Sequence, residues 1–196
     1  MKNVFPVLLI LLFLILIIAC GHAPNTQYYR FQEWEQLDYD PVFNKTLIIK
    51  PFRAHPLLKK QKMVYSLEPF KVDYDHYNQW ALPPAIMLTD MTMDFFRNSG
   101  LFQDVHTVAA GETDAVILTG VLEHFEDRRR MDERYALVAL RFELYKMDAV
   151  TPFWSKIIKR RADISGSETE NIIRAMQKAY RESVQQLAND MIDVIQ

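Results

Sequence analysis

The chain has 196 residues, with 23 Lys and Arg against 25 Asp and Glu, and its formal charge at pH 7 is −2. This balance gives no electrostatic reason to bind nucleic acid, which attracts basic surfaces. The single cysteine cannot form an internal disulfide, and the length suits one domain behind a short amino-terminal segment.

That amino-terminal segment has the features of a secretory signal. Lys2 supplies a positive charge before an apolar run from Val4 to Ala19. The run is shorter than the roughly 20 residues that a bilayer-spanning helix needs. It ends with the string Ile17–Gly21, in which a small residue precedes Cys20, and this string resembles the lipobox of bacterial lipoproteins.

The resemblance to a lipobox implies that a signal peptide, residues 1–19, is removed and that the Cys20 thiol receives a diacylglycerol. It also implies that the freed amine is acylated, and we expect no cofactor other than these covalent lipids. Two or more acyl chains hold a protein on a membrane stably, whereas one binds marginally. The alternative is a free buried cysteine at the end of a membrane helix.

Residues 20–45 are expected to be the lipidated cysteine and a tether, because polar turn residues follow Cys20. The tether carries several aromatic side chains, so its later part is expected to lie against the domain or a partner. A strand follows at Thr46–Phe52, where a short apolar run ends at a proline. The basic stretch Lys59–Lys62 predicts a solvated loop or a contact for anionic lipid headgroups, and Met63–Leu67 is a second strand candidate.

The aromatic stretch that precedes the first predicted helix contains the candidate partner contacts Tyr74, Tyr77 and Trp80. Protein interfaces favour Trp and Tyr, but Trp80 could equally fill the domain core. The helix itself is predicted from Pro83–Pro84, which suit a first turn, to Asn98–Gly100, which suit a left-handed end.

The second half of the chain predicts a meander of strands and a long helix. Phe102–Val108 is predicted to be a short strand, and Ala115–Leu122 is a continuous apolar run that predicts a strand in the middle of the sheet. Asp127–Arg134 is highly charged and is expected to be the solvated tip of a hairpin. Further strands are predicted at Val138–Tyr145, where apolar and polar residues alternate, and at Phe153–Lys159.

Ser167–Glu170 has the sequence of a capping box, in which Ser167 and Glu170 would each bond the other's backbone amide. An apolar stripe then runs to Val194 and predicts the long carboxy-terminal helix. The predicted fold class is α+β, an antiparallel or mixed sheet of about five strands with two helices mainly on one face. The other face would be available to partners.

Catalytic and metal-binding motifs are not found in the sequence. There is no Gly-x-Ser-x-Gly, no phosphate-binding glycine loop and no His-Glu-x-x-His. The five histidines are scattered, with no pair at helical ligand spacing. Asp73, Asp75 and His76 would form a hydrolytic site only if distant groups converged on them, so we predict that the protein is not an enzyme.

The mature chain resembles a family, the PqiC-like auxiliary lipoproteins of ABC-type intermembrane lipid transport systems. The motifs that carry the resemblance are the lipobox at Cys20, Tyr28–Tyr29, Met63–Ser66, Asn78–Pro84, Asn98–Phe102 with Val105, and Asp114–Gly120. Trp-Ala-x-Pro-Pro, an amphipathic helix and Ser-Gly-Leu-Phe in that order are moderately specific, and the resemblance covers roughly residues 28 to 195. The auxiliary lipoprotein domain would then span residues 46–196.

This resemblance implies a structural subunit on the periplasmic face of the outer membrane. Its partners would be a membrane-anchored MCE-domain protein and an ABC permease with its ATPase, which move phospholipid between membranes, and a homo-oligomer stays open. Gly21 after the lipidated cysteine fits release to the outer membrane. The implied fold is similar to the amino-terminal domain of TolB.

Two functions of other classes stay open at this stage. A periplasmic lipid-binding carrier would hold an acyl chain between sheet and helices and would need an enclosed apolar cavity of several hundred Å³. An envelope assembly lipoprotein would also use two helices on a sheet. A structural subunit should instead have a packed core and an exposed contact patch.

Overall fold

A computed structural model describes residues 25–33, 39, 43–68, 70–108, 111 and 114–195. The predicted signal peptide and Cys20 therefore lie outside the described residues. None of the helices in the described ranges is both long and apolar enough to cross a membrane.

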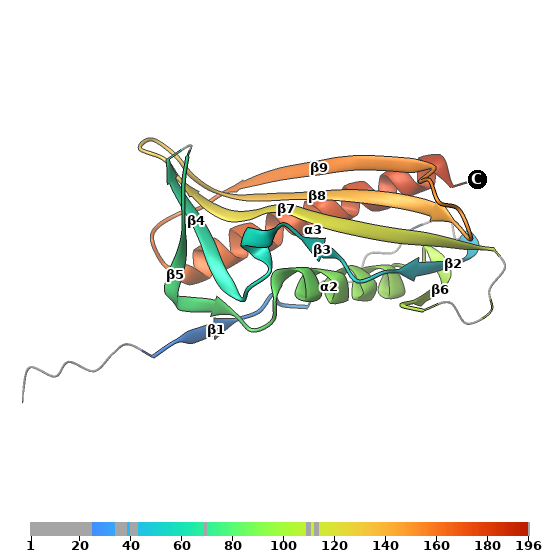
Figure 1. The fold of residues 1–196 in the computed structure, drawn as a ribbon, viewed down its shortest axis with the longest axis horizontal. Coiled ribbons are helices and arrows are strands. Elements are labelled where there is room, and N and C mark those ends of the chain that lie inside the picture. Colours follow the sequence, from blue (N-terminus) through green and yellow to red (C-terminus); the bar gives the residue numbers. More distant parts are fainter. Residues whose placement is uncertain are drawn as a thin grey trace, which may run out of the picture.

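The described chain forms a sheet and two α-helices (Figure 1). Its strands are β1 (Gln27–Tyr29), β2 (Phe43–Ile49), β3 (Arg53–Ala54), β4 (Lys62–Glu68), β5 (Lys71–Trp80), β6 (Phe102–His106), β7 (Ala115–Arg129), β8 (Arg134–Lys146) and β9 (Trp154–Asp163). Its helices are the short 3₁₀ turn η1 (Pro56–Leu58), α2 (Pro84–Ser99) and α3 (Thr169–Val194). The predicted α+β class is confirmed.

Strand β7 organises the sheet because both of its edges are paired. One edge runs antiparallel to β8, which pairs with β9, so the predicted meander is observed. The other edge meets three strands in turn, each parallel to it: β2 from Ala115 to Leu118, β3 at Val121 and Leu122, and β4 from Glu126 to Arg128. Beyond these strands, β6 lies next to β2, β5 lies next to β4, and β1 lies next to β5.

The described sheet has nine strands rather than about five. Strand β5 was not predicted, because its polar residues show no apolar period. It forms because β4 pairs with it antiparallel on one side and β1 pairs with it parallel on the other. Strands β1 and β3 are only three and two residues long and carry too little pattern to be recognised.

Both helices pack on one face of the sheet, as predicted (Figure 1). Helix α3 lies mainly against β8 and β9, and α2 lies against β6, β3 and β7. The buried Tyr180 hydroxyl of α3 donates to the Leu88 carbonyl of α2 at 2.6 Å and also bonds the Thr92 hydroxyl. This contact fixes the two helices relative to each other.

Helix α2 has the predicted ends, whereas α3 begins differently. The first turn of α2 contains Pro84, and Gly100 ends it with a φ of 68°, a conformation that glycine adopts at little cost. Helix α3 has Glu168 at its N-cap without a side-chain capping bond, so the predicted capping box is wrong. The long apolar stripe of α3 is buried and stabilises the helix without that cap.

Gly120 lets an aromatic side chain lie directly on β7. A Cβ atom at this position would be 2.6 Å from the Phe52 ring, which is closer than side-chain carbons can approach. The Phe52 ring in turn contacts Phe142 of β8 edge to face, with 5.8 Å between ring centroids. The residue that ends the first predicted strand therefore packs in the core.

Candidate functional site

The three predicted partner-contact residues have different environments. Trp80 is only 1% exposed and packs against Phe31 and Phe125, with ring centroids 5.6 and 5.0 Å away. Its side chain belongs to the core, which is one of the two alternatives that the sequence left open for this residue. Tyr74 is partly buried and donates its hydroxyl to the Leu57 carbonyl at 3.2 Å. Tyr77 is half exposed and stays a prediction.

The β4–β5 and β7–β8 hairpins turn at the same end of the sheet, which we name the hairpin end (Figure 1). A charged cluster lies there. The sequence predicts that Asp127–Arg134 is a solvated tip. In the structure β7 continues to Arg129, paired with Arg134 of β8, and Asp127 is 2% exposed. The prediction of a hairpin is right, but the prediction that Asp127 is solvated is wrong.

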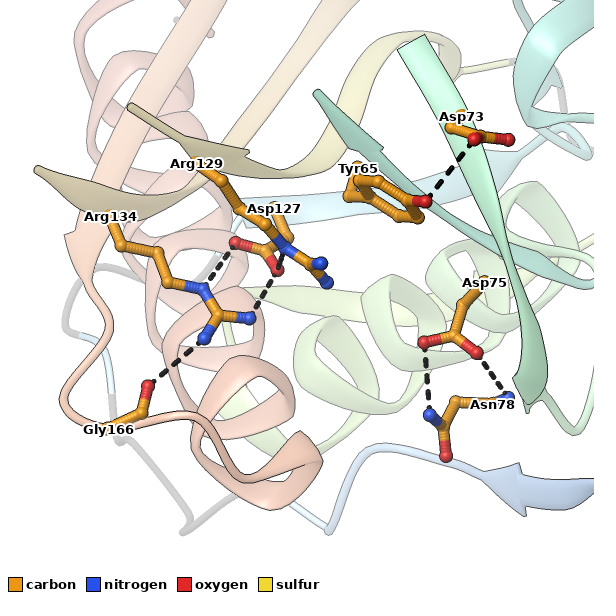
Figure 2. A network of polar contacts seen from close by, with 8 residues as sticks. All are labelled: Tyr65, Asp73, Asp75, Asn78, Asp127, Arg129, Arg134 and Gly166. Atoms are coloured by element: carbon orange, nitrogen blue, oxygen red, sulfur yellow. Dashed lines mark hydrogen bonds and ion pairs between the residues drawn. The ribbon is translucent and has the colours of Figure 1, made fainter. Parts of the chain in front are cut away.

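Two arginines hold the buried Asp127 carboxylate (Figure 2). Arg129 donates from Nε at 2.7 Å, and Arg134 donates from Nη2 at 2.6 Å and from Nε at 3.0 Å. These bonds raise the pKa of Arg134, chiefly through the hydrogen bond to Asp127. Arg134 also donates to the Gly166 carbonyl at 3.1 Å, which ties the hairpin to the chain just before α3.

The cluster continues across β4 to β5 through an aromatic ring. The Arg129 guanidinium carbon lies 4.2 Å from the centre of the Tyr65 ring, a favourable cation–π arrangement. The Tyr65 hydroxyl donates to Asp73 at 3.3 Å (Figure 2). Burial and the neighbouring Asp73 raise the pKa of Tyr65. Tyr65 therefore stays protonated and keeps its hydrogen bond at neutral pH.

Asp73 and Asp75 are both held in the charged form. The Tyr74 backbone N–H, followed by the Tyr65 hydroxyl, lowers the pKa of Asp73. Burial raises the pKa of Asp75, but hydrogen bonds from the Asn78 side chain and from two backbone N–H groups outweigh burial and lower it. A general acid needs the opposite shift, so neither carboxyl group is poised to act as a general acid.

Glu126 lies on the other face of β7, because neighbouring strand residues point to opposite sides. It is 4% exposed and bonds His124 Nδ1 and Arg128 Nη2, each at 2.7 Å. These residues line a hollow of about 460 Å³ together with His55 and Val64. A second hollow, of about 600 Å³, lies near the end of α3 and is lined by charged residues including Lys45, Asp114, Lys146 and Asp193.

The described residues contain no group of three His, Cys, Asp or Glu side chains that could hold a metal ion. Three acids of the hairpin end, Glu126, Asp127 and Glu133, are bonded to arginines. This geometry is typical of a rigid structural connection between hairpins. Two α-helices on one face of a single sheet define this part of the chain as a small α+β domain.

The comparisons with known proteins assign this domain to a family. Residues 39–190 match the family described as the ABC-type transport auxiliary lipoprotein component, so the chain belongs to that family. Comparison with curated proteins finds no significant match.

Solved structures share the fold. Protein XCC0632 from Xanthomonas campestris is 18% identical, with a TM-score of 0.75 over 83% of this chain and 93% of its own. An uncharacterized protein is 12% identical, with a TM-score of 0.69 over 85% of this chain and 99% of its own. At these identities the likeness concerns the fold alone.

Proposed function

We propose that the mature chain is a non-catalytic lipoprotein subunit of an ABC-type system that moves phospholipid between membranes. The family match over residues 39–190 carries this proposal, because it includes the strands from β2 to β9, helix α2 and most of α3. In this function the chain contributes contacts and position rather than chemistry. Its partners are an MCE-domain protein and the ABC permease with its ATPase.

The absence of catalysis is supported by the state of the charged groups. Asp127 and Glu126 are bonded to arginines, and the pKa values of Asp73 and Asp75 lie below the usual range. Neither Asp73 nor Asp75 has the raised pKa of a general acid. The cluster is suited to hold hairpins together.

The chain is anchored in this proposal to the periplasmic face of the outer membrane through lipids on Cys20. The support is the lipobox that ends at Cys20 and the Gly21 that follows it. Diacylglycerol on the thiol and an acyl chain on the amine hold the body at the membrane surface. No other cofactor is part of the proposal.

A periplasmic lipid carrier receives less support from the structure. A carrier needs an enclosed apolar space, but both hollows described above have charged residues in their walls. The layer between helices and sheet is filled by side chains with no exposure, including Leu88, Leu122, Phe142 and Tyr180. A packed core of this kind favours a structural subunit.

The test is affinity purification of the lipidated full chain from chemically crosslinked membranes. The proposal predicts that an MCE-domain protein and an ABC permease co-purify with it. A Cys20→Ser variant, which should be found outside the membrane fraction, is the control for association that needs the anchor. Recovery of a different envelope machine, with neither of these partners, would contradict the proposal and favour an assembly lipoprotein.

A further inference from the structure

Two neighbouring hairpin turns at the hairpin end carry fully exposed apolar side chains. Phe70, in the β4–β5 turn, is 99% exposed, and Met131, in the β7–β8 turn, is 102% exposed. Leu67 and Val72 on either side of Phe70 are 41% and 43% exposed. The turns leave the sheet side by side, because β4 pairs with β7 up to Ser66 and Arg128 (Figure 1).

A single exposed apolar residue is ordinary on a protein surface, but a group of them at one end indicates a contact site. Elsewhere Val150 is 93% exposed, in the β8–β9 turn at the opposite end of β8. It provides a natural comparison, since it has similar exposure but lies far from the hairpin end.

The position of β1 brings the hairpin end within reach of the proposed lipid anchor. Gln27 pairs with Asn78 near the end of β5. The seven residue-to-residue steps from Cys20 to Gln27 span at most about 25 Å when extended. The seven steps along β5 from Lys71 to Asn78 cover about 23 Å. The extended segment is therefore long enough for the lipids on Cys20 and the β4–β5 turn to reach the same membrane surface, even if β5 stands perpendicular to that surface.

Three of the acids at the hairpin end are paired with arginines of the same chain. Asp127 pairs with Arg129 and Arg134, Glu126 pairs with Arg128, and Glu133 pairs with Arg130 and Arg161. The residues from Glu126 to Arg134 include four acids and four arginines. A surface of this kind does not select an anionic partner. The most exposed large side chains of its two turns, Phe70 and Met131, are apolar.

We propose that Phe70, Met131, Leu67 and Val72 insert into the phospholipid interface of the membrane that holds the Cys20 lipids. This inference rests on the proposed lipid anchoring. The Asp127 bridges and the Arg134 bond to Gly166 hold the hairpins in place, so the turns lose little conformational freedom on insertion. Two attachments orient the body, with its carboxy-terminal end directed away from the bilayer.

The test uses the lipidated full chain in phosphatidylcholine vesicles. Because Cys20 is the only cysteine and would be occupied by lipid, a cysteine introduced by Phe70→Cys, Met131→Cys or Val150→Cys is the one free thiol. Each variant is labelled with a polarity-sensitive fluorophore, and quenching by nitroxide-bearing phospholipids is measured. Circular dichroism checks that each labelled variant keeps its fold.

We expect nitroxides near the headgroup boundary to quench the labels at positions 70 and 131, since interfacial insertion reaches roughly 5–10 Å. The label at position 150 should stay unquenched and accessible to aqueous iodide. Vesicle flotation tests lipid anchoring separately from insertion of the turns, because flotation reports attachment through the Cys20 lipids. If the chain floats but the labels at positions 70 and 131 are as unquenched and as accessible to iodide as the label at 150, membrane insertion is overturned and lipid anchoring is not. Protection of these labels only after a partner protein is added would also overturn membrane insertion.

Discussion

Replacing Asp127 by asparagine tests whether the buried carboxylate holds the hairpin end together. The carboxylate is 3% exposed, and its partners Arg129 and Arg134 are 33% and 22% exposed. Removing one partner of a fully buried pair costs about 3–5 kcal/mol. Because both arginines can regain some water, we expect the free energy of unfolding to fall by about 2–4 kcal/mol.

The matched control is Glu133→Gln, in the same hairpin. Glu133 bridges Arg130 at 3.5 Å and Arg161 at 2.9 Å, but its side chain is 45% exposed. Exposed pairs of this kind contribute roughly 0–1 kcal/mol. Urea unfolding of the detergent-solubilised chain, followed by circular dichroism, gives both values. If the two substitutions lower stability equally, the buried cluster does not have the structural role argued for it.

Three further predictions concern the core and the anchor. Gly120→Ala should lower the free energy of unfolding by about 1–3 kcal/mol through overpacking, because the new Cβ meets the Phe52 ring. Thermal unfolding measures this loss. Adding Phe52→Leu to the same chain should recover part of it. Burial raises the pKa of Tyr180 above its ordinary value of 10.0, so only the unfolded chain ionises this group as the pH passes that value, and stability should fall there. In Tyr180→Phe the loss of stability at alkaline pH should be smaller, and stability at neutral pH should fall by about 1–2 kcal/mol because the hydroxyl hydrogen bonds are lost. Thermal melting across a pH series measures both effects. If the variant loses as much stability at alkaline pH as the parent, groups other than Tyr180 cause that loss. Cys20→Ser should abolish incorporation of labelled palmitate and release the chain from membranes, and palmitate labelling equal to that of the parent would refute the lipid site.

The helices and the strands of the meander could be predicted because local pattern determines them. Helix α2 begins at a proline and ends at Gly100, and the apolar stripe of α3 has helical period over its whole length. In the second half of β8 the buried Leu140, Phe142 and Leu144 alternate with the more exposed Arg141, Glu143 and Tyr145. Each of these signals lies within one element and needs no knowledge of its neighbours.

The Asp127 cluster and the environment of Trp80 could not be predicted in this way. A run of four acids and four arginines has the composition of a solvated turn. In the structure β4 and β8 pair with both edges of β7 and keep Asp127 in the sheet, and the chain before α3 approaches from a distant part of the sequence. Trp80 is buried because Phe31 and Phe125 meet it there.

The amino-acid sequence by itself determined the α+β class, both helices, the meander and the likeness to a lipoprotein family, because periodicity and short motifs are local properties. Only the tertiary structure decided the strand count, the burial of Asp127 and the position of Phe70 and Met131 in turns at the same end of the sheet. These depend on which segments lie side by side. A polar strand such as β5 is stabilised by its neighbours, and a charge can be buried when partners from several strands compensate the loss of water.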